Sequence, residues 1–418
     1  MSEKPLEGLK VCMVGANRIS ADTNAYRRAM ALANAGAKVT IVNADNCLTP
    51  LLEEAPFEIV LTGTGAFPKQ IIIKDMNRVL SKILMTAPGR RFRGLEYRLR
   101  KARWTKHRQE ARWPELEKAA IKTGADVIHT TNLYSIYPAM RAAKKLDAKL
   151  IYDSRELWRS VLNDPFFENW FAPDKLDNYI GLEREIAKNA DAIITVSEDI
   201  AESLAQDYSI SLPTVIYSGP LNKVNEVTAL DLDVVRVFFQ GNYRVTANVS
   251  TLIDAMSILG DGYVLTLQGR NFLGGEIERK VQDEGLKNVR IIEQCPFDQT
   301  VQEASLHDIG VYPANKFRDG YYDENFEKTV PNKLFTYMAG GLAVVIPDLQ
   351  AMKRIVNRTG SGVVMDVSTP EGIAEGIRKL GEDREKLLIT KNASLAAVDE
   401  FLWENQSEKL IEVYKNLR

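Results

Sequence analysis

Two carboxylates and an arginine follow a short apolar run in the first half of the sequence. Asp153, Arg155 and Glu156 come directly after the run at residues 149–152. A carboxylate beside a reacting hydroxyl group can orient that group or accept its proton. Asp153 and Glu156 are therefore candidate catalytic residues. The alternative is an Asp/Arg/Glu cluster that only stabilises its own loop.

A lysine near the start of a helical pattern is the main feature of the second half. Asn332 and Lys333 follow a proline and precede the helical run. Lysine, arginine or the first-turn amides of a helix can stabilise the negative charge of a phosphate group without a metal ion. Asn332 and Lys333 are candidate phosphate ligands, and Arg244 and Arg270, in loops after apolar runs, are further candidate cations. The alternative is a proline-started helix with a solvated lysine and two surface arginines.

The loop after the first apolar run also carries polar side chains. Asn17, Arg18 and Asp22 follow Gly15, where the run ends. The loop lacks the G-x-G-x-x-G spacing, which disfavours a dinucleotide cofactor. We expect these three side chains to line a cleft, although Asp22 could instead cap the helix that follows.

Short β-branched runs alternate with helical patterns along the whole chain. This alternation, in two successive series, predicts an α/β protein of two doubly wound, Rossmann-like domains with parallel sheets. Ligands of such sheets bind at the carboxyl ends of the strands, where the residues above fall. We predict a first domain over 1–219, a second over 220–400 and a terminal helix within 401–418. The predicted strands lie at 9–14, 38–42, 127–129, 149–152, 192–196, 214–217, 234–239, 263–267, 289–292, 309–313, 343–346 and 362–364.

Composition narrows the class of protein. The chain has 418 residues, a net charge of −2, three cysteines and three histidines without metal-ligand spacing. No apolar run approaches the ~20 residues of a membrane-spanning helix. These features favour a reducing, cytoplasmic setting and no metal site.

One segment, residues 78–112, is strongly basic, with twelve Lys/Arg against two Glu. Its interleaved aromatic residues suit an amphipathic helix at the inner face of a membrane, or a grip on the phosphate of a lipid-linked acceptor. The alternative is a solvated helix that packs its aromatic side chains on the domain. Nucleic-acid binding is disfavoured because no nucleic-acid-binding fold accompanies the charge.

Four stretches together resemble the family-4 glycosyltransferases, which have the GT-B fold of two domains facing across a cleft. Within that family they are most similar to a subgroup with a Tyr-Asp-Ala-His-Glu-Leu signature. The resemblance implies a nucleotide-sugar donor bound by the second domain and a glycan or lipid-linked acceptor bound by the first. It also implies retention of anomeric configuration and no metal or cofactor. The stretches are 125–132, 152–158, 190–198 and 330–341.

The sequence departs from the family pattern at several polar positions. In the first domain, Thr131 stands for the second histidine, Asn132 for an acidic residue and Arg155 for the signature histidine. In the second domain, Thr336 stands for the glutamate that binds the ribose, and Glu327 neighbours the position of its partner glutamate. As the resemblance implies, we treat the first three, together with Asn17, Arg18 and Asp22, as acceptor-side candidates, and the last two as donor-binding candidates. In the loop after the second domain's first strand, Asn242 and Ala247 stand where the family has Arg and Lys.

These observations predict a hexosyltransferase-like enzyme that acts in polysaccharide biosynthesis. One alternative is a non-catalytic relative that binds a glycan or a partner protein, since many site positions are exchanged. A second alternative is a sugar-nucleotide epimerase.

Overall fold

The computed structural model describes residues 4–16, 19, 22–44, 50–63, 112–163, 173–243, 247–271, 273, 275–318 and 321–418. Contacts group the chain into two compact units. The first unit is Met1–Ile194 with Ile411–Arg418, and the second is Thr195–Leu410. The predicted boundary between residues 219 and 220 stays a prediction.

The first unit is built on a seven-stranded sheet in the order β3-β2-β1-β4-β5-β6-β7. The registers from β3 to β5 are parallel, as the βαβ pattern predicts. The strands are β1 (Lys10–Gly15), β2 (Lys38–Asn43), β3 (Glu58–Leu61), β4 (Val127–Thr130), β5 (Lys149–Ser154), β6 (Ala192–Thr195) and β7 (Thr214–Val215). The helices are α1 (Thr23–Asn34), α2 (Pro50–Glu53), α5 (Trp113–Lys122), α6 (Ile136–Leu146), α7 (Trp158–Asn163), α8 (Pro173–Asn189) and α9 (Glu198–Tyr208). By contact, α9 and β7 belong to the second unit.

The second unit is built on a six-stranded parallel sheet in the order β10-β9-β8-β11-β14-β15. Its strands are β8 (Val235–Gln240), β9 (Tyr263–Gln268), β10 (Val289–Ile292), β11 (Ile309–Val311), β14 (Ala343–Pro347) and β15 (Gly362–Met365). A small antiparallel pair, β12 (Phe317–Arg318) and β13 (Tyr321–Tyr322), follows β11. The helices are α10 (Val249–Leu259), α11 (Glu276–Asp283), α12 (Thr300–Ser305), α13 (Glu324–Lys328), α14 (Asn332–Ala339), α15 (Gln350–Thr359), α16 (Pro370–Gly381), α17 (Arg384–Ala397) and α18 (Trp403–Lys415).

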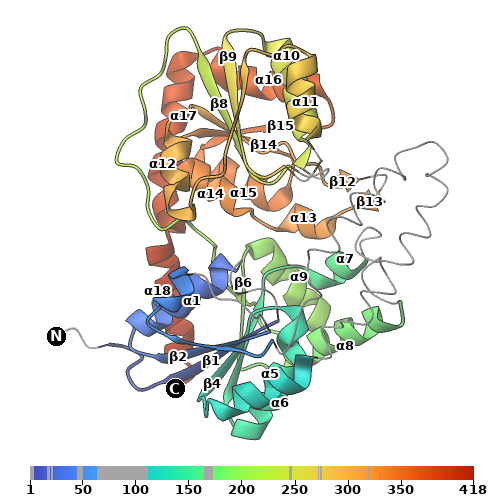
Figure 1. Cartoon of the computed structure of the whole chain (residues 1–418), viewed down its shortest axis with the longest axis vertical. Coiled ribbons are helices and arrows are strands. Elements are labelled where there is room, and N and C mark those ends of the chain that lie inside the picture. Colours follow the sequence, from blue (N-terminus) through green and yellow to red (C-terminus); the bar gives the residue numbers. More distant parts are fainter. Residues whose placement is uncertain are drawn as a thin grey trace. The chain divides into compact units, whose positions relative to one another are not determined.

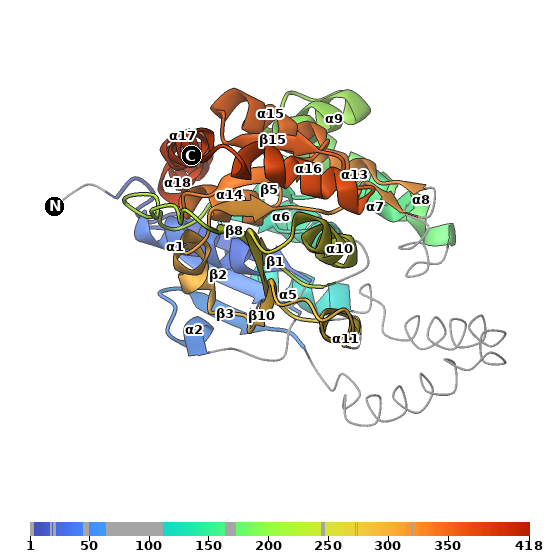
Figure 2. The same ribbon diagram turned by 90° about the horizontal axis from the view of Figure 1, so that it is seen from above.

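Both faces of the second sheet are buried. Alternate residues of β8 point to opposite faces, so Val237 and Phe239 join one apolar cluster while Phe238 joins another. On the first face α10 and α16 pack against each other (Figures 1 and 2). On the other face α14 contributes Leu334 and Phe335. A parallel sheet covered on both faces leaves its strand-end edges for ligands.

The last helix is confirmed, and its end docks on the first unit. The division between the units falls within α18, so Tyr414 belongs to the first unit, where its side chain is fully buried. Arg418 donates hydrogen bonds to the backbone carbonyls of Pro5 and Glu7. The C-terminal segment is therefore a structural part of the unit that contains the N-terminal half of the chain.

All twelve predicted strands are confirmed, with bounds that differ by at most two residues. Strand β3 and the β12–β13 pair were not predicted from the sequence. β3 lies at the edge of its sheet, and Ile59, Val60 and Leu61 are only partly buried, so its apolar signal is short. The β12–β13 strands have two residues each, too few for any periodicity.

Candidate functional site

Lys333 lies at the carboxyl edge of the second sheet. It stands in the first turn of α14, and its ammonium group lies over two aromatic rings, 5.0 Å from the ring centre of Phe239 and 5.1 Å from that of Tyr312. Burial alone lowers the pKa of Lys333 from 10.5 to about 8. No carboxylate of the described residues forms an ion pair with it. A partly dehydrated cation without a counter-ion is a binding position for an anion.

Two glycines make room for this ammonium group. Gly241 follows β8 with φ +147°, and a Cβ added there would lie 2.4 Å from Nζ of Lys333. Gly269 follows β9 with φ +155°, and a Cβ there would lie 1.8 Å from the carbonyl oxygen of Gly241. Only glycine tolerates both the backbone conformation and the close approach. The ends of β8 and β9 and the start of α14 are thus brought together by the absence of side chains.

Hydrogen bonds fix the same strand ends. The hydroxyl of Tyr337 accepts a hydrogen bond from the backbone amide of Gln240 at 2.9 Å. The side-chain amide of Gln240 donates to the side-chain carbonyl of Gln268 at 2.9 Å. Neither glutamine nor Tyr337 was a predicted site residue, although each glutamine directly precedes one of the two glycines. Gln-Gly at the end of both strands is the signal that the sequence analysis overlooked.

The other donor-binding candidates of the second unit lie in different surroundings. Arg270 directly follows Gly269, and its side chain is exposed. Asn332 is exposed at the first residue of α14, whereas Thr336 is buried and donates to the carbonyl oxygen of Asn332 at 3.2 Å. Glu327 is buried and accepts a hydrogen bond from the backbone amide of Gln350 at 2.9 Å, at the start of α15. Its other oxygen lies 2.8 Å from the ammonium of Lys316.

A buried network of charges gathers the candidates of the first unit. The register of β4 and β5 pairs His129 with Ile151, so Asp153, two residues further, points to the same face of the sheet. Asp153 is fully buried and accepts a hydrogen bond from Arg28 of α1 and, at 2.9 Å, from Nε of Arg155. A carboxylate held by two guanidinium groups is an anchor for their side chains.

Arg155 bridges the strand end to the start of a helix. Its Nη1 donates a hydrogen bond to Asp22 at 2.6 Å, while its Nε donates one to Asp153. Asp22 also caps α1 by accepting a hydrogen bond from the amide of Ala25 at 2.9 Å, which confirms the predicted cap, while its place on an acceptor side stays a prediction. Although burial opposes it, the positive charges of Arg155 and Arg28 lower the pKa of Asp22.

The remaining candidates of the first unit lie at neighbouring strand ends. Thr131 is buried and donates to the carbonyl oxygen of Val14 at 3.3 Å. Asn132 is buried and accepts a hydrogen bond from the amide of Ser135 at 3.2 Å. Glu156 follows Arg155 and is half-buried. Three predicted positions, Asn17, Arg18 and Arg244, and all of segment 78–112 except Arg112 lie outside the described residues.

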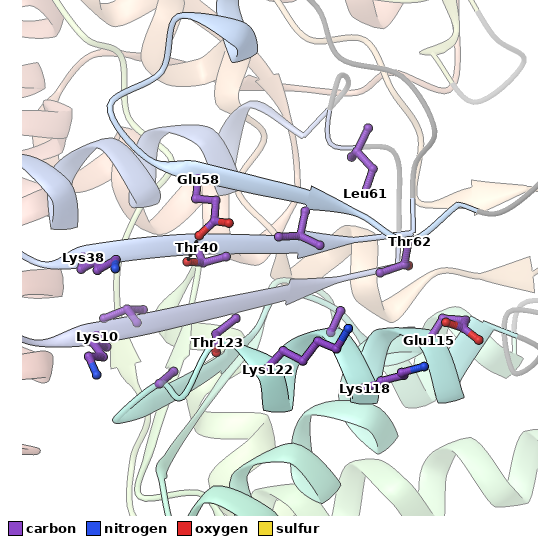
Figure 3. A pocket seen from close by; sticks show the side chains of 14 residues that line it. Lys10, Lys38, Thr40, Glu58, Leu61, Thr62, Glu115, Lys118, Lys122 and Thr123 are labelled. Carbon is purple, nitrogen blue, oxygen red and sulfur yellow. Dashed lines mark hydrogen bonds between the residues drawn. The ribbon is translucent and has the colours of Figure 1, made fainter.

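The first unit also contains a cavity of about 560 Å³, which includes neither the surroundings of Lys333 nor the charge network around Asp153. It lies beside β1, β2 and β3 and is walled by one face of α5, with Lys118 and Lys122 on the helix and Thr40 and Glu58 on the strands (Figure 3). None of the predicted site residues lines it. Thr40 pairs with Cys12 in the register of β1 and β2, on the face opposite to His129. The cavity is therefore separated from the charge network by the sheet itself.

Two negative findings concern the described residues. They contain no group of three or more His, Cys, Asp and Glu side chains arranged to hold a metal ion. Likewise, none of the helices described is both long and apolar enough to cross a membrane.

Comparison with known proteins gives two family matches. Residues 22–219 match the model of Glycosyltransferase Family 4, and residues 234–383 match that of Glycosyl transferases group 1. No curated protein matches the chain.

Solved structures share the fold along nearly the whole chain. Sucrose-phosphate synthase from Thermosynechococcus elongatus is 14% identical, with a TM-score of 0.66 over 98% of this chain and 99% of that one. Anabaena HepE in complex with UDP is 14% identical, with a TM-score of 0.67 over 98% and 100%. The lipopolysaccharide outer core galactosyltransferase WaaB is 12% identical, with a TM-score of 0.61 over 97% and 99%.

At these identities the likeness shows the fold, which is GT-B, while the two family matches show the class of protein. The closer subgroup indicated by residues 152–158 stays a prediction. The chain carries the two domains of a family-4 glycosyltransferase in their order, and it belongs to the glycosyltransferases with the GT-B fold.

Proposed function

We propose that this glycosyltransferase takes its sugar from a nucleotide-sugar donor and that the second unit binds the donor's diphosphate at Lys333. The observation that carries the proposal is the ammonium group of Lys333, which is partly dehydrated, lies over Phe239 and Tyr312, and has no carboxylate partner among the described residues. A diphosphate supplies the missing negative charge. A structural neighbour, HepE, was solved with UDP and with UDP-glucose, which supports this class of donor.

The chemistry follows from charge. As the bond between the anomeric carbon and the diphosphate breaks, negative charge grows on the leaving oxygen. Lys333 and the first-turn amides of α14 are positioned to stabilise that charge, because a helix N-terminus carries a partial positive charge. Arg270, exposed beside Gly269, adds a second cation at the same edge. We therefore propose transfer without a metal ion and without a cofactor, and with retention of anomeric configuration as the family resemblance implies.

The first unit is the proposed acceptor side. Arg155 is presented by two carboxylates, and Glu156 follows it at the carboxyl end of β5. The proposed acceptor is a glycan or a lipid-linked sugar, whose hydroxyl group Glu156 would orient or deprotonate. Cytoplasmic placement and contact of segment 78–112 with the inner face of a membrane remain part of the proposal.

A binding-only protein is the alternative that a specific observation favours. The hydroxyl of Thr336 donates its hydrogen bond to the carbonyl oxygen of Asn332, so Thr336 does not replace a carboxylate that would bind the ribose. The test is a screen of UDP-, GDP- and TDP-sugars with release of nucleoside diphosphate as the readout, with and without acceptor glycans. Acceptor-dependent release, lost in Lys333→Ala, supports transfer. Epimerised free donor would favour the epimerase, and binding of a glycan with no turnover of any donor would favour the binding-only protein.

A further inference from the structure

The C-terminal end of the chain reaches the charge network of the first unit. The hydroxyl of Tyr414 lies 2.6 Å from Nδ1 of His129, and both side chains are fully buried. Nε2 of His129 lies 3.6 Å from a carboxylate oxygen of Asp153 and forms no hydrogen bond. That same oxygen of Asp153 accepts the bonds from Arg28 and Arg155. Five residues from four distant parts of the sequence thus meet on one face of the sheet.

The geometry selects the protonation state of His129. Burial lowers the pKa of His129 well below its ordinary value of 6.5, and the positive charges of Arg28 and Arg155 lower it further. The ring is therefore neutral at pH 7 and carries one proton. Burial also raises the pKa of Tyr414, so its phenol keeps its proton.

The position of that single proton follows from the two neighbours of the ring. A lone pair on Nε2 would face the negative charge of Asp153, which is repulsive, whereas an N–H there faces it favourably. Nδ1 then accepts the hydrogen bond that the hydroxyl of Tyr414 donates. The stable arrangement is the Nε2–H tautomer: Tyr414 donates a hydrogen bond to Nδ1 of His129, and Nε2–H of His129 faces the carboxylate of Asp153.

We propose that Tyr414 is a positioning residue of the acceptor side: its hydroxyl binds Nδ1 and holds the His129 ring so that Nε2–H faces Asp153, which supports Asp153 and, through Asp153, the guanidinium of Arg155. Tyr414 touches no reacting atom. Its effect on transfer rests on the proposed function, whereas its effect on His129 does not. Because Arg155 bonds to both Asp22 and Asp153, a change in the charge or direction of Asp153 moves Arg155 directly.

Polar and charged groups from three elements surround His129 among the described residues. From α1 come Arg28 and, through its cap, Asp22; from the β5 end come Asp153 and Arg155; from α18 comes Tyr414. The sheet neighbours of His129 in the register, Met13 and Ile151, are apolar. Among the described residues, the charged groups that shift the pKa of His129 are Arg28 and Arg155. The hydrogen bond from Tyr414 to His129 therefore connects the C-terminal segment to the surroundings of Asp153, and Tyr414 also interacts electrostatically with Arg28, which bonds to Asp153.

Nitrogen NMR of the imidazole rings tests the first step without any activity. The chain has three histidines, His107, His129 and His307, so the spectrum contains few imidazole signals. Variants such as H107Q assign each signal to its residue. His307 is an internal contrast, because its Nδ1 lies 3.1 Å from the carbonyl of Glu303 and must carry the proton there. We expect His129 in the wild-type protein as Nε2–H, unchanged between about pH 6 and pH 8. An Nδ1–H ring, or a ring that titrates near 6.5, would overturn the proposal even if no variant folds.

The variant Tyr414→Phe tests the second step. Tyr263→Phe is its matched control, because Tyr263 is a buried tyrosine at the start of β9 in the second unit and loses the same atom. In Tyr414→Phe we expect a shifted Nδ1 resonance of His129, because Nδ1 loses its hydrogen bond, and a loss of roughly 10-fold in kcat/KM for the acceptor, with nucleotide affinity unchanged. Tyr263→Phe should change neither. A wild-type His129 spectrum in Tyr414→Phe, or equal acceptor kinetics in the two variants, would contradict the proposal. If no donor is turned over by the wild-type protein, the proposed function fails and the spectrum alone decides this inference.

Discussion

At the scale of single residues, the pKa of Lys333 gives donor binding a pH dependence. With a pKa of about 8, the ammonium is charged below that pH and neutral above it. A terminal phosphate loses its second proton at about pH 6, so the ligand stays ionised throughout. Affinity for a nucleoside diphosphate should therefore fall as the pH rises from about 7 to about 9. Calorimetric titration across this range checks it. A pH-independent affinity in the wild-type protein, or the same pH dependence in Lys333→Ala, would argue against the role of Lys333.

The two predicted catalytic carboxylates should respond differently to neutralisation. Asp153 is fully buried between Arg28 and Arg155, so Asp153→Asn leaves buried positive charge uncompensated and should destabilise the fold by about 3–5 kcal/mol. Glu156 is half-buried, so Glu156→Gln should leave the free energy of unfolding nearly unchanged while it lowers kcat. Chemical denaturation and steady-state kinetics on both variants separate the roles. Equal stability of the two variants would show that Asp153 is not an anchor.

The sequence predicted the types of the site residues better than their partners. Lys333 was chosen for its charge at the start of a helix, and it does lie at a strand-end edge. Other elements supply its partners Phe239, Tyr312 and Gly241, and the sequence around Lys333 does not predict them. Arg28 and Tyr414 were missed for the same reason: each reads as an ordinary helical residue, and only the packing of α1 and α18 brings it to Asp153 and His129.

At the scale of elements, the close approach of the end of β8 to the start of α14 depends on Gly241, which has no side chain. Gly241→Ala adds a Cβ 2.4 Å from Nζ of Lys333 at a φ of +147°, so it should both weaken nucleotide binding and destabilise the fold. Gly285→Ala is the matched control, because Gly285 also has a positive φ, +63°, but faces open space. The control should cost about 1 kcal/mol of stability and leave affinity unchanged. Thermal denaturation and nucleotide titration measure both effects, and equal affinities of the two variants would contradict this packing role.

Strands were predicted more reliably than the connections that place them. A parallel strand buried on both faces, such as β8, is a continuous apolar run that stands out in sequence. The edge strand β3 gave no such signal, because its residues are only partly buried. The position at which α18 packs could not be predicted from the sequence either, because the partner of Tyr414, His129, lies 285 positions away in the chain.

At the scale of the whole molecule, the fold and the two family matches make the protein a glycosyltransferase, and the proposed chemistry needs no metal ion. Transfer should therefore continue in the presence of excess EDTA, because Lys333 and the first turn of α14 stabilise the leaving diphosphate. Initial rates with and without EDTA check this. A rate that collapses in EDTA and recovers with Mg²⁺ or Mn²⁺ would show that a metal ion shares that task.

The most direct measurement is the affinity for the nucleoside diphosphate of the preferred donor, by calorimetry in EDTA at about pH 7, for wild type, Lys333→Ala and Lys287→Ala. Lys287 is an exposed lysine of the same unit, in the loop before β10, and controls for the loss of one surface charge. Loss of a charge-assisted contact to phosphate costs roughly 1.5–3 kcal/mol, so Lys333→Ala should bind about 10-fold or more weakly while Lys287→Ala binds as wild type. Equal affinity in all three proteins would contradict the assignment of the donor's diphosphate to Lys333.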